Sequence, residues 1–399
     1  MATEIRTEQK KERTLIEFFG EVPDPRKKHN LKHKLIDILI IGVCGVIAGC
    51  NNFEEIEEWA LMKEEFLRKF LELRNGIPSH DTINRVFSII DPRIFFQCFM
   101  SWISEVRVML GEKEISIDGK TLCGSRSTKF GKRSALHLVS AWSSQMQISL
   151  GQVRTHEKSN EITAIPELLN LLMIEGCIIT IDAMGCQKEI AALIIEKKAN
   201  YVLALKKNHG DFHEEVETYF NDVEKSNFKN EDCEIFKTIE KDHGRIEKRT
   251  VVITNNINWI TQKPLWKSLQ CIVMVIAERK EKDKKTIEKR YYITSLNKNA
   301  EKIAHIIRSH WSIENQLHWH LDVNFAEDYS RLRTKNNAEN FSSLRKIALA
   351  LLKQESNKPE SFANDTERRL NKKKSIRCKR LRALLDEKYL LKIIGLSTF

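Results

Sequence analysis

Two short stretches, EISIDGK (114–120) and CIITIDA (177–183), decide how this chain folds. Each carries an aspartate, Asp118 or Asp182, at or near its end. Their length and their content of β-branched residues predict buried strands. An unpaired ionised carboxylate is costly in such a place, and the cost disappears if the acid is neutralised or paired. The two aspartates therefore indicate a site that a bound divalent cation would stabilise.

The position of each aspartate on its strand supports this interpretation. Side chains alternate along a strand, so Asp118 lies on the face opposite Ile115 and Ile117 and can point into a crevice. The stretch before Asp182 is apolar on both faces, which is typical of a central strand, and Asp182 stands at its carboxyl end. Ligands of open α/β sheets bind at that end.

The surrounding sequence, from about 113 to 209, alternates between strand and helix patterns. Three predicted strands come first and two strand–helix units follow, which predicts an α/β fold with a mixed sheet covered by helices on both faces. This is the order of a ribonuclease H-like core. After 114–120, the predicted strands are 134–144, 147–155, 177–183 and 201–207, and the predicted helices are 161–175 and 187–199.

Residues 210–298 depart from this alternation. Residues 234–255 predict two strands joined by a turn at Asp242-His243-Gly244, and residues 269–296 predict two more with a lysine-rich connection. The segment therefore resembles an inserted β-domain. A helical pattern returns at about 299 and continues, with interruptions, to the end.

A third acid, Glu314, lies in the returning helix. Apolar residues at spacings of three and four, including Ile307 and Leu317, predict a stripe that faces the core, and Glu314 falls within it. A glutamate facing the core requires a cation nearby. The alternative is a boundary glutamate bonded to His310 or His318, one turn away.

Two strand acids and one helix acid form an oxygen-rich ligand set of the kind that binds two Mg²⁺ or Mn²⁺ ions. Such a pair of ions can polarise a phosphodiester, activate a water and stabilise the leaving 3′ oxygen. The pattern therefore predicts a metal-dependent nuclease. Zinc is the lesser alternative, because His310, His318 and His320 do not share one helical face and no cysteine pair accompanies them.

The first 105 residues are predicted to be helical. Residues 36–49 form an apolar run too short to span a bilayer, so they predict a buried helix. In residues 77–90, Ser79 or Asp81 can cap a short helix that carries Arg85. A helix–turn–helix of this kind suits a DNA-binding head, and a helical packing domain is the alternative.

The net charge of +11 and the pI near 9.1 indicate a polyanionic partner, with nucleic acid ahead of a membrane surface. The alternative is that the positive charge only aids solubility. The basic stretch 367–385 could likewise contact phosphates or form a solvated face. Candidate phosphate contacts elsewhere are Lys206, Lys207 and Asn208 after a predicted strand, and His243, Arg245 and Arg249 at the predicted hairpin.

Several classes of protein are disfavoured. The nine cysteines are scattered without a CxxC pair, and the N-terminus lacks a secretory signal, so a reduced cytosolic protein is expected. A glycine-rich phosphate loop is missing, which argues against nucleotide hydrolysis. Trp259 and Trp266 could stack on an unpaired base, but core positions are the preferred interpretation.

Five longer motifs resemble those of bacterial insertion-sequence transposases of the DDE class, in the group that includes the H-repeat-associated proteins. The resemblance runs from about residue 15 to about 355. The motifs are VPDPRKKHNLKHKLIDILIIGVCGVIAGCNNFEEIEEWA (22–60), NGIPSHDTINRVFS (75–88), SIDGKTLCGS (116–125), TIDAMGCQKEIA (180–191) and HWSIENQLHWHLDVNFAEDYSRLR (310–333).

The resemblance implies a helical N-terminal transposase-associated domain (1–105), a ribonuclease H-like catalytic domain (106–360) with a β-rich insertion, and a basic helical tail (361–399). It implies Asp118, Asp182 and Glu314 as the metal-binding catalytic triad. Related transposases have a tyrosine, an arginine and a lysine near the glutamate. The matching places here hold Ile307, His310 and Leu321, and Arg308 is the candidate replacement for the arginine.

The implied activity is cleavage of DNA at the ends of the element, followed by attack of the freed 3′ hydroxyl on target DNA. Two ends require two active sites, so a homodimer on DNA is expected, in the bacterial cytoplasm and with the nucleoid when bound. Two alternatives remain, namely a nuclease of the same fold that only cleaves and a catalytically inactive DNA-binding relic.

Overall fold

The computed structural model describes residues 14–27, 31–107, 114–127, 134–155, 161–228, 232–242, 245–281, 284–355 and 374–396. The chain divides into two compact units. The first unit combines residues 1–111 with 321–399, and the second unit consists of residues 112–320. All three predicted catalytic acids belong to the second unit.

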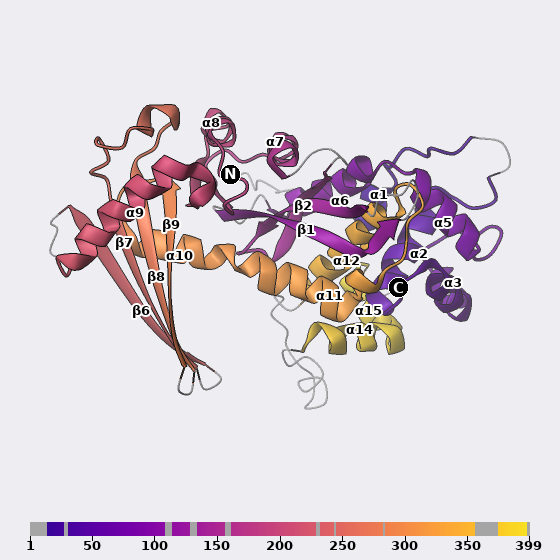
Figure 1. The fold of residues 1–399 in the computed structure, drawn as a ribbon. Helices are drawn as coiled ribbons and strands as arrows, with labels where there is room; N and C mark the ends of the chain where they lie inside the picture. The colour runs from indigo at the N-terminus through magenta and orange to yellow at the C-terminus, as the bar shows by residue number, and fades with distance from the viewer. Residues whose placement is uncertain are drawn as a thin grey trace, which may run out of the picture. The chain divides into compact units, whose positions relative to one another are not determined.

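The second unit is built on a nine-stranded sheet with the order β3-β2-β1-β4-β5-β9-β8-β7-β6 (Figure 1). The strands are β1 Glu114–Ser127, β2 Ser134–Ser143, β3 Ile148–Arg154, β4 Ile178–Ile181, β5 Asn200–Leu205, β6 Cys233–Asp242, β7 Arg245–Thr254, β8 Cys271–Glu281 and β9 Lys284–Thr294.

The first five strands confirm the predicted ribonuclease H-like mixed sheet. β1, β4 and β5 run parallel, and β2 and β3 continue the sheet in antiparallel pairs. Ile117 of β1 lies opposite Ile181 of β4. Because the two strands are parallel, the next residues along the chain, Asp118 and Asp182, follow side by side.

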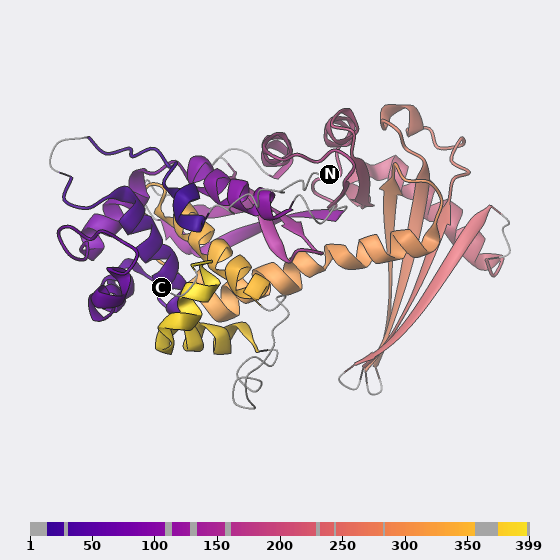
Figure 2. The ribbon, with the colours of Figure 1, turned by 180° about the vertical axis from the view of Figure 1, so that it is seen from behind.

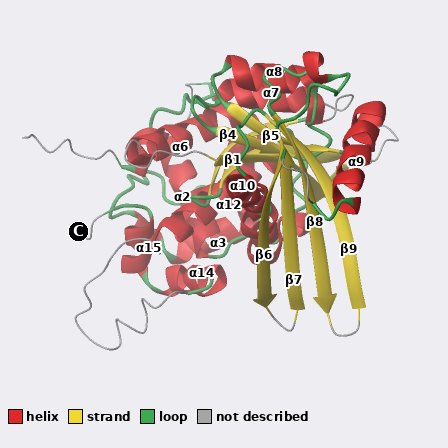
Figure 3. Ribbon diagram, turned by 90° about the vertical axis from the view of Figure 1, so that its left-hand side faces the viewer, coloured by secondary structure: helices red, strands yellow, loops and turns green. Residues whose placement is uncertain are grey.

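Helices cover both faces of this core, as predicted. α7 (Glu161–Leu171) packs on β2 and β3, and α8 (Lys188–Glu196) packs on β5; both are seen above the sheet in Figure 3. α10 (Ala300–His310) lies against the opposite face, where it contacts β1 and β4. Figure 2 shows this helix in orange, continuing to the four strands of the insertion.

The four strands predicted in the insertion are confirmed, but they do not form a separate sheet. β9 pairs antiparallel with β5, with Val202 opposite Thr294, and β8, β7 and β6 follow outward. The insertion therefore extends the sheet of the core instead of forming a sheet of its own. The hairpin turn at residues 243–244, including His243, lies outside the described residues.

One helix of the insertion was not predicted. α9 (Gly210–Lys225) buries Phe212, Val216, Phe220 and Val223 at helical spacing. Its many acidic residues obscured that spacing in the sequence. The pattern of the insertion as a whole is therefore mixed, with strands and one helix.

The first unit is helical in its described part, as predicted. α2 is buried along almost its whole length, which confirms the buried helix expected at 36–49, and Ser79 caps α5. Its helices are α1 Leu15–Phe19, α2 Leu35–Ala48, α3 Phe53–Met62, α4 Glu64–Leu67, α5 His80–Ile89, α6 Pro92–Arg107, α12 Asn337–Gln354, α14 Ile376–Leu385 and α15 Glu387–Ile393, and α11 (Trp319–Phe325) begins at the end of the second unit.

The basic C-terminal stretch is partly structural. Lys379 and Arg380 of α14 are buried and donate hydrogen bonds to the backbone carbonyls of Leu352 and Val46. These two charges face the interior of the first unit, so they belong neither to a solvated face nor to a phosphate contact.

Among the described helices, none is by itself both long and apolar enough to cross a membrane, although α2 and α3 together, with a bend of 94° between them, meet that criterion by length and composition.

Candidate metal centre and its surroundings

The three predicted catalytic acids line one cavity. Asp118, Asp182 and Glu314 share a cavity of about 600 Å³ with Lys206 and Lys207. The two aspartates reach it from neighbouring parallel strands, and the glutamate reaches it from the segment that follows α10. Residues far apart in the sequence thus meet at the end of the sheet where ligands were expected.

Asp118 is the most enclosed of the three acids, with 15% of its side chain exposed. Burial, and then the nearby charge of Glu314, raise the pKa of Asp118 to about 8. Its carboxylate lies 3.5 Å from Nδ1 of His318. An acid with this pKa holds a proton near neutral pH unless a cation replaces it.

Asp182 is the first residue after β4, and its carboxylate faces the turn that leads to α8. It accepts hydrogen bonds from the backbone N–H groups of Met184 at 3.1 Å and Gly185 at 3.4 Å. Burial, and then the charge of Glu161, raise the pKa of Asp182. These two bonds orient the carboxylate and leave lone pairs for another ligand.

Glu314 differs from the prediction in its exposure. The stripe of residues Ile307 and Leu317 is buried, but 53% of the Glu314 side chain is exposed. The reason is a π-helical segment, Ile313–His318, which shifts the register after α10 and turns Glu314 toward the cavity. Single π-helical turns occur often at functional sites.

His318 links two of the acids. Its Nδ1 lies 3.5 Å from Glu314 as well as 3.5 Å from Asp118, so the predicted contact between Glu314 and a histidine one turn away is present. The hydrogen bond from His318 lowers the pKa of Glu314. In the part of the chain that is described, Asp118, Glu314 and His318 are the group whose possible ligand atoms all lie within 4.8 Å of one another.

This donor set fits a hard divalent cation. Asp118 and Glu314 contribute carboxylates to this set, and Asp182 lines the same cavity without belonging to the group within 4.8 Å. Burial raises the pKa of both aspartates, and a cation would stabilise their ionised forms. Carboxylate oxygens are ligands that hard divalent cations prefer.

Another histidine, His310, lines the cavity and takes part in a chain of hydrogen bonds. Nδ1 of His310 is hydrogen-bonded to the Thr180 hydroxyl at 2.8 Å, and Thr180 also bonds to Ser116 at 3.2 Å. Burial lowers the pKa of His310 to about 4, so its ring is neutral. This chain of bonds fixes the end of α10 onto β1 and β4, directly behind the acids.

The segment after β5 has a mixed role. Lys206 and Lys207 line the cavity, as a phosphate contact would require. The side-chain amide of Asn208 instead donates to the carbonyl of Ala183 at 3.0 Å, and His209 bonds to the carbonyl of Cys186. The last two side chains hold the turn that carries Asp182.

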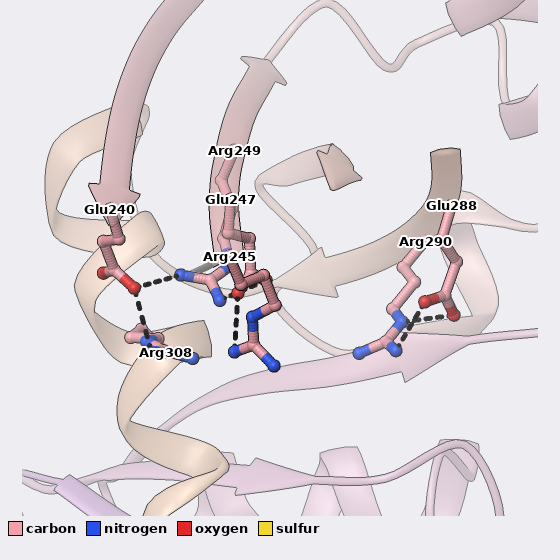
Figure 4. Close-up of polar contacts among 7 residues, drawn as sticks. All are labelled: Glu240, Arg245, Glu247, Arg249, Glu288, Arg290 and Arg308. Carbon is pink, nitrogen blue, oxygen red and sulfur yellow. Dashed lines mark hydrogen bonds and ion pairs between the residues drawn. The ribbon is translucent and has the colours of Figure 1, made fainter. Parts of the chain in front are cut away.

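The predicted arginines line a second cavity of about 540 Å³, between the insertion and α10 (Figure 4). Arg308 and Arg249 donate to Glu240 at 3.0 and 3.2 Å. Arg249 also contacts Glu247, and Arg245 lies 3.4 Å from the same carboxylate. The arginines are thus gathered in one place but are already paired with acids.

Sequence reasoning missed Arg290, which lines both cavities. It pairs with Glu288 at 2.7 Å, and its guanidinium lies 4.6 Å from the centre of the Trp311 ring. Strand alternation at residues 288–292 predicts that Glu288, Arg290 and Tyr292 share one face of the strand. It does not predict which face of the sheet that is. Trp266 is buried, which confirms the core interpretation for that residue. The same interpretation is wrong for Trp259, which is 38% exposed and stacks on Tyr219 at the surface.

Comparison with known proteins identifies relatives along most of the chain. Residues 110–351 match the family described as transposase DDE domain, and residues 16–103 match the domain associated with it. The chain is 44% identical over 344 residues to "Putative transposase YncI" of Escherichia coli O157:H7, covering 85% of this chain and 87% of that protein.

It is also 41% identical over 345 residues to "H repeat-associated putative transposase YhhI" of Escherichia coli K12, covering 85% of this chain and 90% of that protein. Among solved structures, a piggyBac transposase synaptic complex with hairpin DNA is similar with a TM-score of 0.42 and 11% identity, over 97% of this chain and 79% of that one.

Proposed function

The chain belongs to the transposase family defined by the DDE domain, and from that premise we propose that it cleaves DNA at the ends of an insertion element and joins the freed 3′ hydroxyl to target DNA. The observation that carries the proposal is the meeting of Asp118, Asp182 and Glu314 in one cavity. Carboxylates that meet in one cavity are suited to hold cations at a phosphodiester.

We propose that these three acids are the metal ligands and that two Mg²⁺ or Mn²⁺ ions bind. When bound, the ions would supply charge neutralisation at the scissile phosphate and at the attacking and leaving oxygens. Asp118 and Asp182 hold their positions through the parallel strands β1 and β4, and the π-helical segment presents Glu314 to them. His318 orients Asp118 and Glu314 from the side.

The surrounding cations would position the DNA. Lys206, Lys207 and Arg290 line the cavity of the acids and are placed to contact phosphates on either side of the bond that breaks. Arg245, Arg249 and Arg308, with His243 at the hairpin, would contact the DNA farther along. For these arginines to bind DNA, phosphates would have to replace the glutamates as their ion-pair partners.

The remaining proposals concern assembly. Because an element has two ends, we expect a homodimer on DNA, acting in the bacterial cytoplasm. Residues 1–105 would form the associated DNA-contacting domain, residues 106–360 the catalytic domain and residues 361–399 a basic tail.

The test is cleavage and joining of DNA that carries the flanking inverted repeats, with Mg²⁺, Mn²⁺ or EDTA. Asp182→Asn keeps the size of the side chain and removes its charge, so nicking and joining should both fall by at least about a hundredfold. Asp211→Asn removes an exposed acid of α9 as a matched control and should retain native activity.

The outcomes separate the alternatives. Metal-dependent nicking without joined products would indicate a nuclease that only cleaves. Binding of the repeats with no chemistry in any metal would indicate a DNA-binding relic, and equal activity in Asp182→Asn and native protein would contradict the proposed site.

A further inference from the structure

The two faces of the inserted sheet β6–β9 carry different kinds of charge. The inner face, toward α10, holds the arginines and glutamates that line the second cavity (Figure 4). Because side chains alternate, the residues between them point to the other side. That side carries what we call the lysine face, which consists of Lys237, Lys241, Lys248, Lys280 and Lys285 with Ile239, Ile246 and Ile287.

The strand register gathers these residues, apart from Lys237, into two adjoining rows, and Lys237 lies opposite Thr250 in the row next to them. One row across the four strands is Ile239, Lys248, Glu278 and Ile287, and the next row outward is Lys241, Ile246, Lys280 and Lys285. Neighbouring strands lie about 4.8 Å apart, so each row is roughly 15 Å wide. The lysines are therefore neighbours in space, although they come from four strands.

The lysine face is open to solvent. Ile239, Ile246 and Ile287 are 69%, 36% and 57% exposed, which is unusual for isoleucines on a sheet. α9 covers only the part of this side nearer the core, where Tyr291 packs on Phe220 and Lys289 pairs with Glu224. Figure 3 shows the strands continuing beyond the helices.

Charge on the lysine face is not balanced. Glu278 is its acidic residue and lies 2.9 Å from Lys285, which leaves four lysines in excess. On the inner face, in contrast, Glu240, Glu247 and Glu288 each pair with an arginine. Four arginines of the insertion, Arg245, Arg249, Arg279 and Arg290, line that cavity beside these three glutamates, an excess of one. The insertion therefore presents most of its positive excess on the side away from the arginine cavity.

We propose that the lysine face binds the backbone of duplex DNA, as a contact separate from the cavity where cleavage takes place. This inference rests on the proposed function, which supplies DNA as the polyanion. Several lysines spread over a flat surface suit a row of phosphates, which lysines contact as point charges without reading sequence. A protein partner is disfavoured, because lysine is depleted from protein interfaces.

The test measures binding of the full-length protein to a linear duplex without element ends, in EDTA, by fluorescence anisotropy over a series of salt concentrations. Lys237, Lys241, Lys248 and Lys280 are changed together to Gln. The matched control changes Lys197, Lys198, Lys267 and Lys302 to Gln, which removes the same charge elsewhere on the second unit. Thermal unfolding verifies that both variants are folded.

The lysine-face variant should bind at least about tenfold more weakly. Its slope of log affinity against log salt should become shallower by up to about 3.6, because four phosphate contacts are lost and each contributes about 0.9. The control should stay within about twofold of native protein. Equal losses in both variants, or none in either, would overturn the inference and leave the lysines as solubilising charges at the end of a sheet.

Cleavage of repeat-bearing DNA by native protein is measured alongside and reports on the proposed function. Nicking by native protein together with unaltered duplex binding by the lysine-face variant overturns only the inference. Lysine-dependent binding without nicking in any metal overturns the catalytic proposal and supports the inference. Failure of native protein to bind the duplex overturns the inference, and both proposals fail if native protein also does not nick repeat-bearing DNA in any metal.

Discussion

Asp118 and Glu314 contact the same histidine, His318, but the pKa values of the two carboxyl groups shift in opposite directions. Burial and the Glu314 charge raise the pKa of Asp118, whereas the hydrogen bond from His318 lowers the pKa of Glu314. Without a cation, Asp118 is therefore the acid that holds a proton, and Glu314 stays ionised. Binding of a divalent ion must displace that proton from Asp118.

This arrangement predicts how stability depends on pH in metal-free protein. The pKa of Asp118 rises from 3.8 to about 8 on folding. The contribution of Asp118 to the free energy of unfolding is fully present below the pKa of the unfolded chain. It is lost as pH rises through the pKa of the folded protein. In EDTA, the free energy of unfolding should therefore fall between pH 5 and 8, by at most about 1.4 kcal/mol per pH unit from this group.

Chemical denaturation of native protein and Asp118→Asn at both pH values measures the effect. The variant cannot ionise at this position, so its stability should change less with pH, and Mn²⁺ should stabilise native protein more at pH 8 than at pH 5. Asp211→Asn serves as the control and should follow native protein. Parallel pH profiles for native protein and Asp118→Asn would contradict the raised pKa.

At the scale of residues, the sequence predicted that Asp118 and Asp182 belong to one site on the sheet. It did not predict the exposure of Glu314 or the presence of Arg290 in the same cavity. Asp182 follows from its place directly after a buried strand, and Asp118 follows from the alternation that turns it away from Ile115 and Ile117. The predicted end of the first strand at residue 120 was too early, because β1 continues to Ser127. Glu314 was predicted to face the core, and a π-helical turn cannot be anticipated from a spacing of 3.6 residues. Arg290 was missed because its role depends on which face of β9 meets α10.

At the scale of elements, the β6–β7 hairpin depends on Glu247. Only 10% of its side chain and 17% of the Arg249 side chain are exposed, and Arg245 shares the same carboxylate. Glu247→Gln removes the charge between two guanidinium groups and should lower the free energy of unfolding by about 2 kcal/mol. Affinity for duplex DNA should rise at the same time, because the arginines lose their competing anion.

The two effects are measured by denaturation and by fluorescence anisotropy. Glu301→Gln, at an exposed position of α10, removes one negative charge from the same unit and should change stability little. A loss of stability without a gain in DNA affinity would show that the arginine cavity does not take part in binding DNA.

Local patterns predicted the strands of the core and of the insertion, but not how they combine. Val202 and Thr294 pair across 91 residues of intervening chain, and neither residue's surroundings in the sequence indicate that contact. α9 was missed because acidic residues interrupt its apolar positions. The spacing of apolar residues predicts which face of a helix or strand is buried. It does not predict which other element packs against that face.

For the molecule as a whole, continuity of the nine-stranded sheet predicts a gradient of local stability. Residues Tyr291–Thr294 of β9 are paired on both sides, with β5 and β8, whereas the outer ends of β8 and β9 lie in exposed hairpins. Backbone amides near β5 should exchange as slowly as those of β1 and β4, and exchange should quicken toward Glu281 and Lys284.

Hydrogen exchange followed by mass spectrometry measures this gradient on the intact protein. β2 provides the comparison, because it is another paired strand of the same sheet. Rapid exchange of β6–β9 as a single block, independent of β1 and β4, would show that the insertion opens as a module of its own.

The pairing of β5 with β9 also has an evolutionary consequence. The chain leaves the five-stranded core at Leu205 and returns beside that same strand at Tyr291. Lys206–His209 and Arg290 border the three acids or hold the turn that carries Asp182, so they are tied to the site. The chain between His209 and Arg290 is an excursion with adjacent ends, which can lengthen, shorten or be replaced over generations without moving Asp118, Asp182 or Glu314.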